Sequence, residues 1–228
     1  MQVKMKRNGD CWQFISNLWN PDEGRDKARS AMYDEILQNY WSAIIEKWDS
    51  DECNKNKIND IITYYANSDD PLDQAGYCMR DIDGDGNDEL LIGEITGGGY
   101  PDFIFDAYTV RRGECNRIYD MNGGERDRFY IAEDNTVYED RSGGAAEQSL
   151  THYRANGVFS YINLVPEDGI IYSEDGSGGR DKPYYYAESY NVNVSSEWEQ
   201  ITEAEFNDYK DEAATSYAKL DLKPFSQL

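Results

Sequence analysis

The chain has 228 residues and is strongly acidic, with 45 Asp and Glu against 22 Lys and Arg and a formal net charge of −23 at pH 7. Nucleic-acid backbones and anionic membranes are bound through clustered Lys and Arg, so we expect neither as a direct partner. No apolar run approaches the roughly 18 residues that a membrane-spanning helix needs, and we expect no direct membrane insertion. With 39% hydrophobic residues, the chain can still bury the core of a globular domain.

The first 28 residues form a segment that the sequence pattern does not classify. Lys4, Lys6 and Arg7 give a basic start, but no apolar stretch follows them, so we recognise no intact signal peptide. The chain is therefore either cytosolic or the mature form of an exported protein. Residues 29–228 are predicted to form a single α+β domain.

Two amphipathic helices are predicted between residues 30 and 66. Apolar residues recur at three- and four-residue steps from residue 30 to residue 48, with Ser30 as the N-cap. The segment 20–24 contains Pro21 and Gly24, which we interpret as ending any earlier helix. A second helix is predicted over residues 55–66, with Ile58, Ile61, Ile62 and Tyr65 as its apolar positions.

An antiparallel β-meander is predicted from residue 75 to residue 195. Short runs rich in Tyr, Ile, Val and Phe alternate there with Gly, Asp and Asn clusters every eight to twelve residues. The predicted strands cover residues 90–96, 103–110, 117–121, 129–132, 136–138, 149–154, 158–164, 169–172 and 184–194. Hairpin turns are predicted at four pairs whose residues tolerate positive φ: Gly113-Glu114, Asp134-Asn135, Asn156-Gly157 and Asp168-Gly169.

A final helix is predicted over residues 202–217, because Thr202 and Glu205 have the spacing of a capping box. The expected fold is therefore α+β, with N-terminal helices packed on an antiparallel β-meander and a C-terminal helix.

The segment from Asp81 to Glu89 has the spacing of a calcium-binding loop. A short peptide can wrap a hard cation if alternate side chains offer oxygen ligands and a glycine allows a sharp turn. The candidate ligands are Asp81, Asp83, Asp85, Asn87 and Glu89, with Gly86 at the turn. Position 12 of the loop is Ile92 rather than the glutamate of an EF-hand, so Glu89 at position 9 is expected to close the site. The predicted cofactor is Ca²⁺.

This loop resembles the D-x-D-x-D-G-x-x-[D/E] loops of FG-GAP, dockerin-like and other extracellular calcium-binding repeats. The order of motifs along the chain also resembles a group of exported, often lipid-anchored bacterial proteins of unknown function. The shared features are a Tyr-x-x-Ile-Leu helix from Tyr33, a D-x-D-G-D-G-x-x-E-L-L-I-G segment from Asp81 to Gly93, a Gly/Ser loop at 142–145 and an I-T-E-x-E-[FY] helix from Ile201. The resemblance implies calcium binding and an extracellular or cell-surface location.

The four cysteines do not decide the compartment. Cys11, Cys53, Cys78 and Cys115 contain no C-x-x-C pair, which argues against a zinc or thioredoxin-like site. Two disulfides, Cys11–Cys53 and Cys78–Cys115, are one interpretation, and four buried thiols are the other.

No catalytic motif stands out in the sequence, and the single histidine, His152, is interpreted as an ordinary residue. The leading hypothesis is an extracytoplasmic calcium-binding module that binds a protein or glycan ligand through its many tyrosines. The alternatives are a calcium-stabilised hydrolase of glycans or peptides, and an acidic mimic of nucleic acid that blocks a basic protein.

Overall fold

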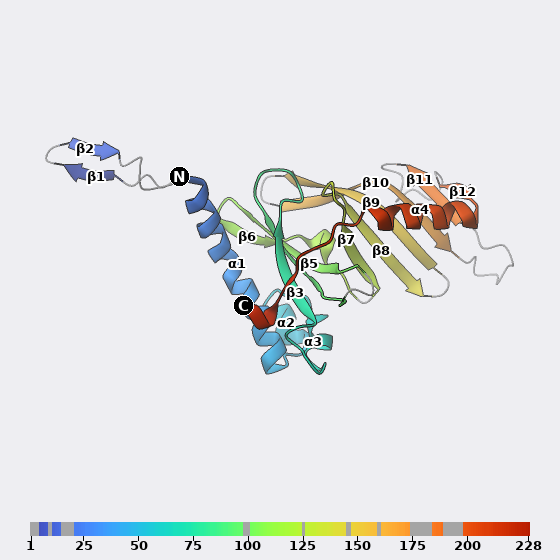
Figure 1. The fold of residues 1–228 in the computed structure, drawn as a ribbon, viewed down its shortest axis with the longest axis horizontal. Coiled ribbons are helices and arrows are strands. Elements are labelled where there is room, and N and C mark those ends of the chain that lie inside the picture. The colour runs from blue at the N-terminus through green and yellow to red at the C-terminus, as the bar shows by residue number, and fades with distance from the viewer. Residues whose placement is uncertain are drawn as a thin grey trace.

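The computed structural model describes residues 5–8, 11–14, 21–97, 101–124, 126–144, 147–158, 161–173, 184–188 and 198–228. Helices near both ends of the chain flank a large antiparallel sheet (Figure 1), which confirms the α+β class. In the described part of the chain, no helix combines the length and the apolar character needed to cross a membrane.

The first helix, α1, spans Pro21–Glu46 and therefore starts well before Ser30. The expected N-cap at Ser30 was wrong, because this residue and residues 21–24 all lie inside the helix, whereas residues 15–20, where an earlier helix would end, lie outside the described residues. Proline is favoured in the first turn of a helix, because its φ is already helical and its missing N–H needs no partner there. The expected domain boundary at residue 28 thus falls inside α1.

Most of the helix expected over 55–66 is not α-helical, because α2 (Ser50–Lys55) ends at its first residue and α3 (Ile62–Tyr65) covers only four residues near its end. Asp49 caps α2 by accepting the Glu52 N–H at 2.8 Å. Lys57 then has a φ of 59°, a left-handed conformation that a continuous helix does not allow. Of the four predicted apolar positions, Ile58, Ile62 and Tyr65 are buried, whereas Ile61 is only half-buried.

A small hairpin and a large sheet contain the strands of the described residues. β1 (Met5–Asn8) pairs with β2 (Cys11–Phe14). The strand order in the large sheet is β12-β11-β10-β9-β8-β7-β5-β4-β3-β13, and β6 pairs with β5. These strands are β3 (Ala75–Arg80), β4 (Glu89–Glu94), β5 (Phe103–Arg111), β6 (Glu114–Arg117), β7 (Asp127–Ile131), β8 (Val137–Gly144), β9 (Glu147–Val158), β10 (Tyr161–Ser173), β11 (Tyr184–Glu188), β12 (Glu199–Ile201) and β13 (Lys223–Pro224).

The sheet corrects several predicted boundaries. Residues 117–121 are not a strand, because β6 ends at Arg117 and a 3₁₀ turn, η1 (Tyr119–Met121), follows. The strand expected at 158–164 instead spans the junction of β9 and β10, and β3 was missed. The part of the expected strand 184–194 beyond residue 188 lies outside the described residues.

Two of the four expected turns are present. Asn135 has a φ of 71° between β7 and β8, and Gly113 has a φ of 81° in the turn that it shares with Arg112. The other two were wrong, because Asn156 and Gly157 pair with Asn163 and Ile162 inside the β9–β10 ladder. Asp168 likewise pairs with His152 there, next to a β-bulge.

Both faces of the sheet are covered. Helices α1–α3 pack on one face of β3–β5, where Leu90, Ile92, Phe103 and Phe105 are buried. Successive residues of a strand point to opposite faces. Leu91 and Ile104 accordingly join a second cluster, which includes Ala155 of β9 and Ile162 of β10. The end of the β9–β10 hairpin therefore lies against the far side of β4 and β5.

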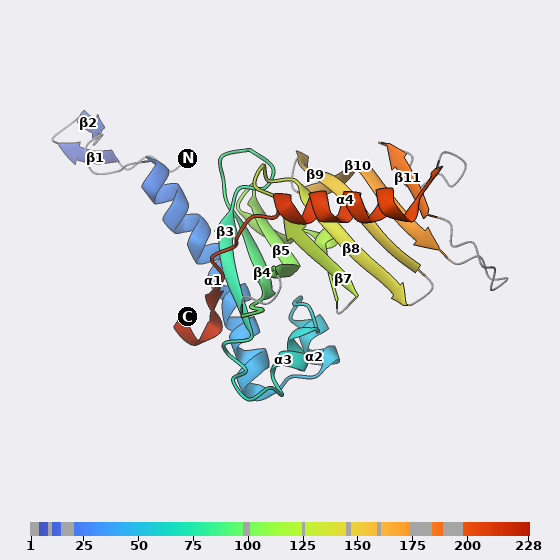
Figure 2. The same ribbon diagram turned by 45° about the vertical axis from the view of Figure 1, so that its right-hand side comes forward.

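The C-terminal helix α4 (Glu203–Ser216) lies along the part of the sheet formed by β8–β11 (Figure 2). Phe206 and Ala213 pack there against Leu150, Ile170 and Tyr172. The predicted capping box is confirmed: the Glu205 N–H donates to Thr202 Oγ1 at 3.2 Å and the Thr202 N–H donates to Glu205 Oε2 at 2.8 Å. The chain ends in a 3₁₀ turn, η4 (Phe225–Gln227).

Cys53, Cys78 and Cys115 are free thiols, so neither of the two disulfides considered above forms. Burial raises the pKa of Cys53 and Cys115 to about 11 and that of Cys78 to about 12. The interpretation as buried thiols is therefore confirmed for Cys53, whereas Cys78 and Cys115 are unpaired but only half-buried. The side chain of Cys11 lies outside the part of the chain whose side chains the structure describes.

Candidate metal centre

The loop 81–88 connects β3 to β4 and is shaped by its own aspartates. Asp81 accepts the N–H groups of Gly84 and Gly86, each at 2.8 Å, and Asp83 accepts the Asp85 N–H at 3.2 Å. Gly84 and Gly86 have φ angles of +74° and +81°, which residues with a Cβ rarely adopt. Alternating aspartates and glycines thus close the peptide into a compact turn.

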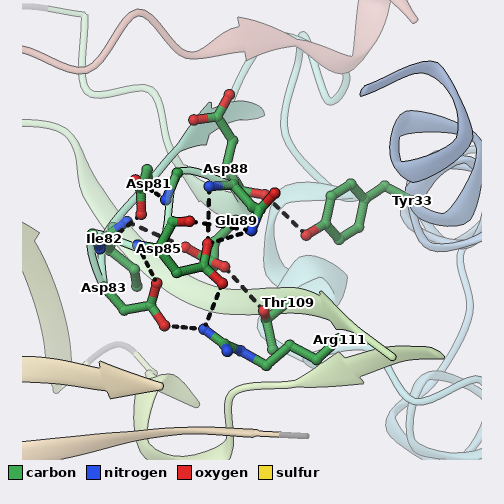
Figure 3. Close-up of polar contacts among 12 residues, drawn as sticks. Tyr33, Asp81, Ile82, Asp83, Asp85, Asp88, Glu89, Thr109 and Arg111 are labelled. Atoms are coloured by element: carbon green, nitrogen blue, oxygen red, sulfur yellow. Dashed lines mark hydrogen bonds and ion pairs between the residues drawn. The ribbon is translucent and has the colours of Figure 1, made fainter. Parts of the chain in front are cut away.

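Three of the five predicted ligands converge. One carboxylate oxygen from each of Asp81, Asp83 and Glu89 lies within 4.8 Å of the other two (Figure 3). Oxygens this close fit a shared hard cation, since Ca²⁺ is bound at roughly 2.3–2.6 Å by six to eight oxygens. The convergence follows from topology: Asp81 directly follows β3, and Glu89 is the first residue of β4.

Glu89 is the buried member of the group, with 1% of its surface exposed. Thr109 Oγ1 donates to Oε1 at 2.9 Å, and the Ile82 N–H donates to Oε2 at 3.2 Å. Burial raises the pKa of Glu89 to about 8, and the negative charge of Asp83 adds to the rise. A cation beside a carboxylate has the opposite effect, because it favours the ionised form.

Asp85 is not part of this convergent group of carboxylates, and it is hydrogen-bonded to Asn87. Asp85 Oδ1 accepts both the backbone N–H of Asn87, at 2.9 Å, and its side-chain amide, at 2.6 Å. The other Asp85 oxygen, Oδ2, lies 3.2 Å from Arg111 Nη2. Asp85 therefore contacts both Asn87 and Arg111, while the carboxylates of Asp81, Asp83 and Glu89 converge.

Arg111, at the end of β5, is a member of the site that the sequence pattern missed. Its Nη2 contacts Asp83 as well as Asp85. Burial raises the pKa of Asp83, and the Arg111 guanidinium opposes this rise. Nothing in the loop sequence points to this residue, because its place is set by the pairing of β4 with β5.

Two further elements enclose the loop. The Tyr33 hydroxyl of α1 donates to the backbone oxygen of Asp88 at 3.2 Å (Figure 3). Gly157 of β9 lies so close to the Asp83–Arg111 pair that a Cβ at this position would collide with both side chains. Helix α1 and the β9–β10 hairpin thus fix the loop from two sides.

The donor set fits an oxygen-seeking divalent cation. Four carboxylates and one guanidinium give the site, made up of Asp81, Asp83, Asp85, Glu89 and Arg111, a formal charge of −3 when all are ionised. The site contains neither thiolate nor imidazole, the ligands that zinc and copper favour. Carboxylate and carbonyl oxygens are the ligands of calcium and magnesium, and calcium tolerates irregular geometry better.

His152 lies in a different part of the sheet and makes structural contacts. Its ring stacks on Tyr138, with 4.4 Å between the centroids, and its Nδ1 lies 3.6 Å from Asp168 Oδ1. Tyr209 of α4 donates to the same Asp168 oxygen. Burial acts to raise the pKa of Asp168, but hydrogen bonds from His152 and Tyr209 outweigh it and hold the pKa below its usual range. The cluster joins α4 to β9 and β10.

Comparisons with known proteins add no further assignment: no protein-family model, no curated protein and no solved structure matches the chain.

Proposed function

We propose that the protein is a calcium-binding module that works outside the cytoplasm by binding a ligand or partner. The calcium-binding part of this proposal rests on the convergence of carboxylate oxygens of Asp81, Asp83 and the buried Glu89 within 4.8 Å of one another. The resemblance of the segment Asp81–Gly93 to calcium loops of exported bacterial proteins supports the location.

The role of the ion in this proposal is structural. Asp81 and Glu89 stand at the adjoining ends of β3 and β4, and Asp83 contacts Arg111 of β5. A calcium ion shared by these carboxylates connects the three strands β3, β4 and β5. Its positive charge also offsets the electrostatic repulsion among the neighbouring carboxylates. The same loop contacts α1 and β9, so the ion stabilises the junction between the helices and the sheet.

Thermal unfolding, measured once in the presence of calcium and once in the presence of a chelator, tests the proposed calcium binding. A ligand that binds only the folded state stabilises it by about 2.7 kcal/mol at 100 times its Kd. For a chain of this size the melting temperature is therefore expected to rise by about 5–10 °C between EDTA and saturating calcium. Magnesium at the same ionic strength controls for general screening of the acidic surface.

Matched variants separate the loop from the rest of the acidic surface. Asp83→Asn and Glu89→Gln remove ligand charges and are expected to abolish the calcium-dependent rise in melting temperature. Asp69→Asn removes the same charge from an exposed position outside the loop and is expected to keep the full rise. The proposal fails if wild type shows no rise and no calcium binding by calorimetry, or if Asp69→Asn loses the rise equally.

A further inference from the structure

A pocket of about 410 Å³ lies between α3 and the strands β4, β5 and β7. In Figure 2, α3 lies below the lower ends of these strands. Tyr64 and Tyr65 line the pocket from the helix side, and Glu94, Phe103, Arg126 and Arg128 line it from the sheet side. The pocket is at the opposite end of β4 from Glu89, so it is separate from the candidate metal centre.

Two arginines give this pocket a positive side in an otherwise acidic protein. Arg126 immediately precedes β7, Arg128 is the second residue of that strand, and both side chains line the pocket. Both are exposed, and among the described residues neither forms an ion pair. Arg111, Arg117, Arg141 and Arg154, in contrast, each pair with an acid.

The Arg128 guanidinium is also held in place. It lies over the ring of Phe103, 5.0 Å from its centroid, and such a stack fixes the plane of the group. A guanidinium presents its N–H donors in a planar fork that matches a carboxylate. Two adjacent forks without acidic partners are suited to one carboxylate of a ligand.

The opposite wall of the pocket offers acceptors and an aromatic ring. Glu94 accepts a hydrogen bond from the Tyr65 hydroxyl, and within the described part of the chain no ion pair joins it to either arginine. Its carboxylate keeps further lone pairs for donors from a ligand. Tyr64 is 67% exposed and packs edge-on against Tyr65, with 5.6 Å between the centroids. An exposed aromatic face of this kind suits the C–H face of a sugar ring.

We propose that this pocket binds a hexuronate, an acidic sugar unit. Its carboxylate pairs with Arg126 and Arg128, its hydroxyl groups donate to Glu94, and its ring packs against Tyr64. The carboxylate of Glu94 disfavours a doubly charged phosphate, whereas a sugar carries one negative charge and several donors. A volume of about 410 Å³ is within the usual range for small-molecule sites.

Calorimetric titration of the full chain with D-glucuronate and D-galacturonate tests the inference. At least one of them is expected to bind saturably, and the matching neutral methyl glycoside and acetate are expected to bind at least tenfold more weakly. Arg126→Gln and Arg128→Gln are each expected to weaken binding about tenfold, because each removes charge-assisted hydrogen bonds. Tyr64→Ala is expected to weaken binding severalfold. The side chains of Tyr64, Arg126 and Arg128 are all exposed to solvent.

Arg154→Gln is the matched control, since it removes the same charge from an exposed site on β9 and is expected to leave binding unchanged. The inference is overturned if neither uronate binds wild type saturably, if acetate binds as tightly, or if the two pocket variants retain wild-type affinity.

This inference rests on the ligand-binding part of the proposed function but not on calcium. Uronate binding is therefore measured both in EDTA and in calcium, and again with Asp83→Asn, and it is expected to persist in all three. Loss of the calcium response with intact uronate binding contradicts the metal site alone. An intact calcium response without uronate binding contradicts the pocket alone.

Discussion

Replacing Arg117 with methionine is expected to destabilise the protein strongly, because it leaves the buried carboxylate of Asp106 without a countercharge. Asp106 of β5 is 0% exposed, and Arg117 Nε donates to its Oδ1 at 2.7 Å. The hydroxyls of Tyr40 and Tyr108 donate to Oδ2 at 2.5 and 2.7 Å. Burial raises the pKa of Asp106, and Arg117 and the two hydroxyls oppose that rise. Methionine keeps the apolar stem of the arginine but removes the countercharge.

The expected loss follows from the burial of the pair. Removing one partner of a buried ion pair costs about 3–5 kcal/mol. Arg117 is 12% exposed and the two tyrosines remain as donors, so the lower end of this range, about 3 kcal/mol, is expected. For 228 residues this corresponds to a fall in melting temperature of about 6–12 °C.

The pH dependence provides a second signature. Without Arg117, the folded-state pKa of Asp106 rises further above the unfolded value of about 3.9. The folded state then binds the proton more tightly than the unfolded state, so stability is highest at low pH and falls as pH rises through the folded pKa. Between the two pKa values, Arg117→Met is expected to lose about 1.4 kcal/mol per pH unit relative to a variant without this carboxylate.

Urea unfolding followed by tryptophan fluorescence between pH 4 and pH 8 measures both effects. The double variant Arg117→Met/Asp106→Asn has no unpaired buried carboxylate. It is therefore expected to be more stable than Arg117→Met at pH 8 and to lack the added decrease of stability with pH. If Arg117→Met stays within 1 kcal/mol of wild type, or the two substitutions are additive, then the pair does not contribute as described.

Two further predictions concern α4 and the cysteines. Thr202→Ala removes the capping box and is expected to cost about 1 kcal/mol, whereas Thr202→Asn retains a capping acceptor and is expected to lose less; both are measured by thermal unfolding. Cys53, Cys78 and Cys115 have raised pKa values, so they are expected to react slowly with iodoacetamide at pH 8 in the folded protein and rapidly in urea. Intact-mass analysis counts the modified thiols, and rapid labelling of all three in the folded protein contradicts their burial.

The sequence predicts best where the physical cause lies within a few residues. Thr202 and Glu205 form their capping box because both partners belong to one helical turn. Asn135 and the glycines Gly84 and Gly86 adopt positive φ as their residue types suggest. Asp81, Asp83 and Glu89 likewise converge because all three belong to one nine-residue segment, Asp81–Glu89.

The failures of prediction involve contacts between distant segments. Glycine is a typical turn residue, but Gly157 lies within β9, where the absence of a Cβ makes room for the Asp83–Arg111 pair. Asp168 also looks like a turn residue, yet its carboxylate contacts His152 and Tyr209 from two other elements. The pocket beside α3 could not be predicted from the sequence for the same reason, since Tyr64 lies about 60 residues from Arg126 and Arg128 in the chain.

Arg111 links the geometry of the metal site to the proposed location of the protein. Its guanidinium contacts two of the loop carboxylates, so a divalent cation must bind next to a fixed positive charge. With Arg111 the formal charge of the site is −3 rather than −4, and a lower ligand charge weakens calcium affinity. Sites with Kd values of about 10⁻⁴–10⁻³ M are typical of extracellular modules, whereas cytosolic buffers bind at about 10⁻⁹–10⁻⁸ M. An arginine in contact with two of the candidate loop carboxylates is therefore consistent with the proposed location, where calcium is abundant, and a nanomolar Kd for wild type contradicts that location.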